Sequence, residues 1–75
     1  MRYFFHIHDA QGVVPDEEGS ELPNIAAAVH EARLSARDFV IENLKSGKAL
    51  PNRWIEIVDG DGKVLDRMRI RDVVD

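Results

Sequence analysis

The chain has no cysteine, which excludes a disulfide and a zinc site built on thiolates. No apolar run approaches the roughly 18 residues that a membrane-spanning helix requires. The N-terminal residues also lack the apolar segment and small-residue cleavage site of a signal peptide. A length of 75 residues leaves room for one domain only. We therefore expect a single domain over residues 1–75 that is soluble, cytoplasmic and not associated with a membrane.

Charge is unevenly distributed along the chain, whose formal net charge is −4. Residues 1–31 contain six acids and one base, whereas residues 32–75 contain eight acids and nine bases. The acidic balance disfavours nucleic acid as a partner, because binding it requires a basic surface that releases counterions. A domain this small has a thin core, and association with a second subunit is one way to supplement it.

The first strand is predicted at residues 3–8, which are mostly aromatic or β-branched and so favour a sheet. Alternation places Tyr3, Phe5 and Ile7 on one face of this strand and Phe4, His6 and His8 on the other. A turn leads to a short second strand at residues 13–14, which Pro15 confines to an edge of the sheet. Residues 16–21 are then expected to form an acidic loop.

Residues 24–46 carry the pattern of one long amphipathic helix. Asn24 is a suitable N-cap, and Gly47 is a suitable residue to end the helix. The apolar stripe recurs every three or four positions, as expected for one helix face, at Ile25, Ala28, Val29, Ala32, Ala36, Phe39, Val40, Asn43 and Leu44. The alanines in this stripe allow the helix to approach a sheet closely.

A second hairpin is predicted after a connection at residues 50–52. Residues 54–58 alternate, so that Ile55 and Ile57 face the helix while Trp54, Glu56 and Val58 face away. The turn at residues 59–62 leads into a returning strand, residues 63–70, whose apolar residues do not share one alternation. A β-bulge near the turn would resolve this ambiguity. The tail, residues 71–75, is expected to fray or to finish an edge.

These elements predict an α+β fold in the order strand, strand, helix, strand, strand. The sheet is expected to be mostly antiparallel, with strand 3–8 near its centre and the helix packed across one face. One helix can cover only one face of the sheet, so the other face must meet water, a ligand or a partner.

His6 and His8 lie on the same side of the first strand, roughly 6–7 Å apart. Two imidazoles at this spacing can share a metal ion, and a carboxylate from the acidic loop, such as Asp16, can supply a third ligand. This interpretation predicts a metal-binding or small-ligand-binding protein. The alternative, which is more usual for such pairs, is a solvated or partner-contacting surface without metal.

Arg67, Arg69 and Arg71 alternate, so a regular strand would line three guanidinium groups along one face. Such a stripe suits an acidic partner or phosphate groups, including those of nucleic acid. The alternative is a solvated edge strand whose charges prevent aggregation between sheets. The acidic loop of a neighbouring subunit is one complement for this stripe.

Phe4, His6, Trp54 and Glu56 are predicted to form one patch on the uncovered sheet face. An exposed aromatic patch of this kind often marks an interface. The chain offers no activated nucleophile and no glycine-rich phosphate loop, so we expect neither an enzyme nor a cofactor. The leading hypothesis is a non-enzymatic protein-interaction or regulatory module that forms a homodimer, or binds another small protein, through this face.

The sequence resembles a family of short alphaproteobacterial proteins grouped as a domain of unknown function. The resemblance covers almost the whole chain. Its more specific parts are Tyr-Phe-Phe-His at residues 3–6 and Asp-x-Glu-Gly-x-Glu at residues 16–21. The resemblance implies a bacterial protein that stands alone as one domain, and it implies no activity, cofactor or catalytic residue.

A looser likeness connects the chain with HicB-like antitoxin domains at the level of the fold. In those domains too, an aromatic N-terminal strand precedes an acidic, glycine-containing loop and a helix rich in Ala and Glu. The pattern departs from theirs in that no DNA-binding extension is expected here.

Overall fold

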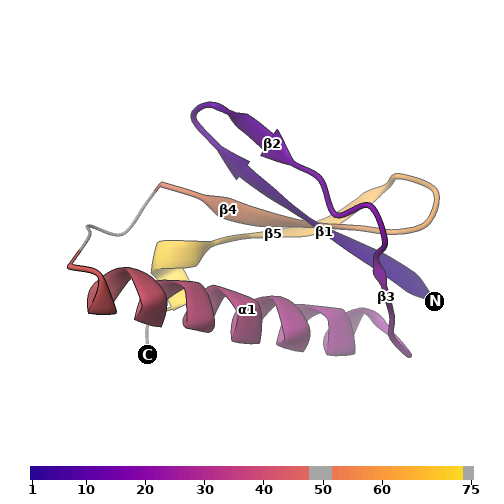
Figure 1. Cartoon of the computed structure of the whole chain (residues 1–75). Helices are drawn as coiled ribbons and strands as arrows, with labels where there is room; N and C mark the ends of the chain where they lie inside the picture. The colour runs from indigo at the N-terminus through magenta and orange to yellow at the C-terminus, as the bar shows by residue number, and fades with distance from the viewer. Residues whose placement is uncertain (48–51, 74–75) are drawn as a thin grey trace.

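An antiparallel sheet with one long helix across one of its faces makes up the computed structural model, which describes residues 1–47 and 52–73 (Figure 1). The predicted α+β fold is thus confirmed. In chain order the elements are β1 (Arg2–Asp9), β2 (Gly12–Val14), β3 (Ser20–Glu21), α1 (Ile25–Lys45), β4 (Trp54–Val58), β5 (Val64–Arg69) and the 3₁₀ helix η1 (Ile70–Val73).

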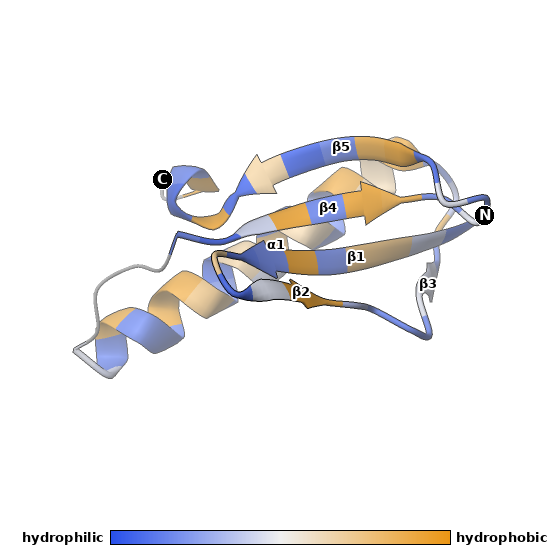
Figure 2. Cartoon of the chain, turned by 90° about the horizontal axis from the view of Figure 1, so that it is seen from above, coloured by the Kyte–Doolittle hydropathy of each residue, from blue (hydrophilic) through white to orange (hydrophobic). Residues whose placement is uncertain are grey.

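The sheet has the strand order β2-β1-β4-β5, which Figure 2 shows from above. β3 also pairs with β1, and because β4 occupies the other side of β1, β2 and β3 lie along the same edge. The central position predicted for the first strand is therefore confirmed. β2 has three residues, lies at the edge of the sheet and is followed by Pro15. The edge position suits Pro15, because proline has no N–H to donate to a neighbouring strand.

A line of small side chains on α1 forms the contact between helix and sheet. Ala28 and Ala36 are 0% exposed and Ala32 is 1% exposed, and they cluster with Ile55 and Ile57 of β4. The predicted caps are confirmed: Asn24 Oδ1 accepts a hydrogen bond from Ala27 N–H at 2.9 Å, and Gly47 has a φ of +70°. The core therefore lies between α1 and one face of the sheet.

The two ends of the predicted helix stripe do not reach the core. Ile25 is 41% exposed and Leu44 is 61% exposed. A helix of 21 residues rises about 31 Å, whereas the five residues of β4 span about 17 Å. The first and last turns of α1 consequently extend past the two ends of β4, which lies over the middle of the helix.

The predicted bulge is present between β4 and β5. Ile57 pairs with Asp66 but Val58 pairs with Val64, so Leu65 is the extra residue. The bulge shifts the alternation by one position, which lets Leu65 and Met68 both pack against the core cluster.

Two predictions about irregular segments are wrong. Ser20 and Glu21, expected in the acidic loop, form β3 and pair with Tyr3 and Arg2. The tail at residues 71–75 was expected to fray or to finish an edge. Its residues 71–73 instead belong to η1, in which Ile70 and Val73 are 1% and 6% exposed. Residues three apart share one side of a 3₁₀ helix, whereas a strand would place them on opposite faces, so only the helical turn buries both.

Some predictions fall on residues 48–51 and 74–75, which lie outside the described residues: most of the connection at residues 50–52 and the last two residues of the tail. Among residues 1–47 and 52–73, no helix combines the length and apolar character needed to cross a membrane.

Candidate functional site

We call the sheet face opposite α1 the open face. Cross-strand pairing arranges its side chains in three rows, which are Phe4, Val58 and Val64, then His6, Glu56 and Arg67, then His8, Trp54 and Arg69. The four residues predicted to form one patch, Phe4, His6, Trp54 and Glu56, all belong to these rows. The predicted alternation therefore assigned the face correctly, and a role in an interface stays a prediction.

Two aromatic side chains of the open face stack on histidines. The rings of His8 and Trp54 are 5.4 Å apart between centroids and inclined by 8°. The rings of Phe4 and His6 are 6.3 Å apart and inclined by 20°. The His8–Trp54 pair joins β1 to β4, whereas the Phe4–His6 pair lies along β1. In both pairs the two rings are stacked.

Glu56 is the buried acid of the open face, with 9% of its surface exposed. Its Oε2 lies 3.3 Å from Arg67 Nε, and its Oε1 lies 3.2 Å from His8 Nε2. The contact with His8 does not have hydrogen-bond geometry, and His8 Nε2 is buried without a hydrogen-bond partner among the described residues. The carboxylate thus lies between the guanidinium of Arg67 and the imidazole of His8, and Arg67 supplies the permanent positive charge beside it.

Asp16 holds the β2–β3 connection against β1. Its Oδ2 accepts a hydrogen bond from Phe5 N–H and its Oδ1 accepts one from Gly19 N–H, both at 3.1 Å. The backbone N–H of Asp16 donates to Nδ1 of His6 at 3.0 Å. Both carboxylate oxygens and one imidazole nitrogen of the predicted metal set therefore bind the backbone. In the part of the chain that the structure describes, no group of three or more His, Asp or Glu residues could hold a metal ion.

Gly19 closes this connection in a way that a residue with a side chain could not. Its φ is +71°, which favours glycine, and a Cβ atom would lie 2.8 Å from Cε2 of Phe4 and 2.9 Å from the carbonyl oxygen of Tyr3. These roles of Asp16 and Gly19 were not predicted from the sequence. The Asp-x-Glu-Gly spacing at residues 16–19 is the sequence pattern that could have indicated them. A carboxylate three residues before a glycine can accept a hydrogen bond from the glycine N–H and so hold a turn.

The arginine stripe is shorter than predicted. Arg67 and Arg69 lie on β5 and are exposed, but Arg71 lies in η1 and does not continue the alternation. The strand ends there because burial of Ile70 and Val73 requires the helical turn. Trp54, Arg67, Arg69 and Asp72 line a shallow hollow of about 340 Å³ at this side of the open face.

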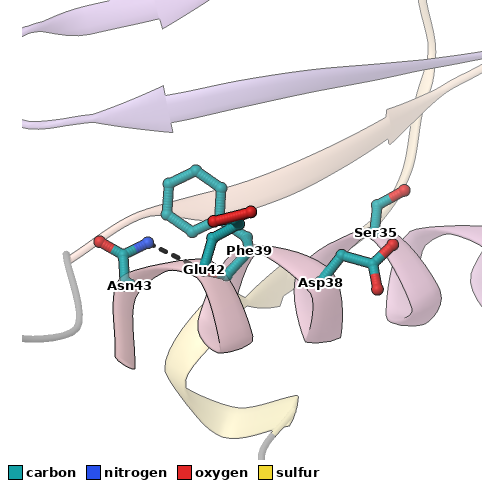
Figure 3. A pocket seen from close by; sticks show the side chains of 5 residues that line it. All are labelled: Ser35, Asp38, Phe39, Glu42 and Asn43. Carbon is teal, nitrogen blue, oxygen red and sulfur yellow. Dashed lines mark hydrogen bonds between the residues drawn. The ribbon is translucent and has the colours of Figure 1, made fainter. Parts of the chain in front are cut away.

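A second hollow, of about 460 Å³, lies on one flank of α1 and was not predicted (Figure 3). It is lined by Ser35, Asp38, Phe39, Glu42 and Asn43. The Arg53 guanidinium lies 5.2 Å from the centre of the Phe39 ring, and Asn43 Nδ2 donates to the Phe39 carbonyl oxygen at 2.8 Å. The first contact joins α1 to the residue before β4 and the second lies within α1, so we assign this flank a structural role.

The arrangement defines a small α+β protein in which one helix covers one face of an antiparallel sheet and the other face carries stacked rings and ion pairs. The model of a family described as a domain of unknown function, DUF6894, matches residues 2–71, and the chain belongs to this family. The predicted resemblance to a domain of unknown function is thereby confirmed, whereas the alphaproteobacterial source and the HicB-like likeness stay predictions. Neither the curated proteins nor the solved structures contained a match.

Proposed function

We propose that this protein is a non-enzymatic interaction or regulatory module that self-associates through its open face. The observation that carries the proposal is the concentration of ring surfaces on a face that α1 leaves uncovered (Figure 1). Aromatic residues and arginine are enriched in protein interfaces, and this face combines Phe4 and Trp54 with Arg67. The histidines contact Trp54, Glu56 and the Asp16 backbone, which is the pattern of a packed surface.

The dimensions of the molecule suit such an interface. Its two longer extents are 37 and 26 Å. A stable interface buries about 800 Å² on each partner, and the product of these two extents is of that order. Val13, which extends the His8 row onto β2, is 50% exposed, and Val64, at the β5 end of the Phe4 row, is 44% exposed. A second copy would cover both.

Sedimentation velocity and native mass spectrometry over a range of concentrations would test the proposal. We expect a wild-type dimer, and we expect Phe4→Ala with Trp54→Ala to weaken it at least about tenfold, or about 1.4 kcal/mol. The matched control is Leu34→Ala with Ile41→Ala, which removes two apolar side chains, 41% and 44% exposed, from α1 on the other side of the sheet. The control should stay dimeric.

Circular dichroism in urea would separate weaker association from weaker folding, because both open-face side chains also pack within one copy. A folded double variant that keeps the wild-type dimer mass would overturn the proposal. So would a wild-type protein that stays monomeric at every concentration tested.

A further inference from the structure

The open face is acidic along one border. Because Ser20 and Glu21 belong to β3, the acidic loop comprises residues 16–19. This loop lies against open-face side chains of β1: the Asp16 N–H donates to His6 Nδ1, and Arg2 Nη1 donates to the Glu18 carbonyl oxygen at 2.7 Å. Glu17 and Glu18 are exposed, and neither carboxylate forms an ion pair with a residue that the structure describes. Two carboxylates without an ion pair therefore border the face beside β1, next to the Arg2 guanidinium, which pairs with Glu21.

The opposite border is basic. Arg67 and Arg69 are exposed on β5, two strands away from β1, and share the hollow of about 340 Å³ with Trp54. Arg67 is paired with Glu56, whereas Arg69 makes no ion pair within residues 1–47 and 52–73. Asp72 lines the same hollow from η1, beyond the row that contains Arg69.

Symmetry decides how these borders meet in a face-to-face pair. The twofold axis of such a pair lies between the two sheets. If the axis runs along the strands, β5 of each copy lies over the β1 side of the other, and each row faces its own equivalent. If the axis runs across the strands, β5 lies over β5 and arginines face arginines. Like charges brought together cost binding free energy, so only the first arrangement is electrostatically complementary.

We propose that the partner of the open face is a second copy of this chain, related by a twofold axis along the strands, whose Glu17 and Glu18 bind Arg67 and Arg69. The proposal rests on the proposed function and adds the partner surface and its orientation. The rows favour the contact with Arg67, because the acidic loop lies beside Phe4 and His6, and Arg67 ends the His6 row. Arg69 ends the neighbouring His8 row, whose other end is Val13, and would reach the loop from one row away. In this arrangement the acidic loop of one copy meets the hollow of the other copy, at the end of the hollow away from Asp72.

Charge exchange between the borders tests the orientation. Arg67→Glu with Arg69→Glu is the basic-border variant, and Glu17→Arg with Glu18→Arg is the acidic-border variant. Each should weaken the homodimer at least about tenfold, since like charges then meet at both contacts. A mixture of the two variants should form a heterodimer, because each contact again joins opposite charges. A chain that carries all four substitutions should recover the homodimer.

Arg33→Glu with Arg37→Glu, two exposed positions on α1, is the charge-matched control and should leave the dimer intact. Arg69→Glu alone is the reserve variant if loss of the Arg67–Glu56 pair affects folding. Heterodimer formation by the mixture, seen as a mixed mass in native mass spectrometry, supports the proposal.

Three results would overturn it. If both border variants stay dimeric while Phe4→Ala with Trp54→Ala dissociates, the face is correct and the orientation is wrong. If the border variants dissociate but neither the mixture nor the fourfold variant recovers a dimer, charge pairing across the borders is wrong. A monomeric wild type removes this proposal together with the proposed function.

Discussion

The carboxylate of Asp16 occupies the place of a neighbouring strand beside Phe5, whose N–H donates to Asp16 Oδ2 at 3.1 Å. β2 pairs with β1 at residues 7–9 and β3 pairs with it at residues 2–3, so the edge of β1 is unpaired between them. A buried backbone donor without an acceptor costs stability, and Asp16 supplies the acceptor at this gap. The same residue thus continues the sheet and fixes the acidic loop.

Replacing Asp16 by Asn tests this role. An amide has one acceptor oxygen, so one of the two backbone N–H groups would lose its partner, and we expect a loss of about 1–3 kcal/mol. Urea unfolding followed by circular dichroism measures the change. The matched control is Asp38→Asn, the same chemical exchange at an exposed position of α1, which should stay within about 0.5 kcal/mol. Equal effects of the two substitutions would contradict the role given to Asp16.

Gly19→Ala should destabilise the fold more than an ordinary glycine substitution. A φ of +71° costs an L-residue about 1–2 kcal/mol, and the added Cβ would also collide with Phe4. We expect a total of about 2 kcal/mol or more, which lowers Tm by about 8 °C or more for a domain of this size. Gly60→Ala is the control, because a Cβ there meets no atom within 4 Å. Thermal melts of the two variants should differ clearly, and similar melting temperatures would argue against the close approach.

Ala36→Leu should separate α1 from the sheet. Ala36 is 0% exposed, so the added carbons have no space, and overpacking costs about 1–3 kcal/mol. Ala26→Leu adds the same atoms at an exposed position of the same helix and should change stability little. Denaturant titrations of both variants give the comparison. A tolerated leucine at residue 36 would mean that the alanine line does not set the distance between helix and sheet.

The Glu56–Arg67 ion pair should contribute little to the free energy of unfolding, although it lies in the middle row of the open face. The Arg67 side chain is 64% exposed, so solvent screens the pair, and a coupling energy below about 1 kcal/mol is expected. A double-mutant cycle with Glu56→Gln and Arg67→Gln measures it, and added salt should reduce it. A coupling above about 2 kcal/mol that persists in salt would show that the pair is desolvated.

Much of the sheet could be predicted because alternation is a local property. Ile55 and Ile57 define one face of β4 by their spacing alone, and this assigned Trp54 and Glu56 to the other face. A bulge was predicted near the turn without its position at Leu65, and β3 was not predicted. Both depend on pairing between strands, since Ser20 and Glu21 form β3 only by pairing with Tyr3 and Arg2 of β1.

The arginine stripe failed for a related reason. Alternation of Arg67, Arg69 and Arg71 describes a strand only as long as the strand continues, and nothing local marks its end at Arg69. The end is set by a core that accepts Ile70 and Val73 from the same side. Sequence patterns identify which residues are apolar, but the space that receives them is formed by α1 and β4 together.

The central place of β1 also governs the order in which the sheet can form. Its partner β4 follows the whole of α1 in the chain, so the ladder between β1 and β4 closes a loop that contains β2, β3 and α1. Contacts of this kind pay a large loop-closure entropy before they contribute stability, which slows folding. The β1–β2 hairpin and α1 both precede β4 in the chain, so the buried alanines of α1 meet Ile55 and Ile57 only after this slow ladder has closed.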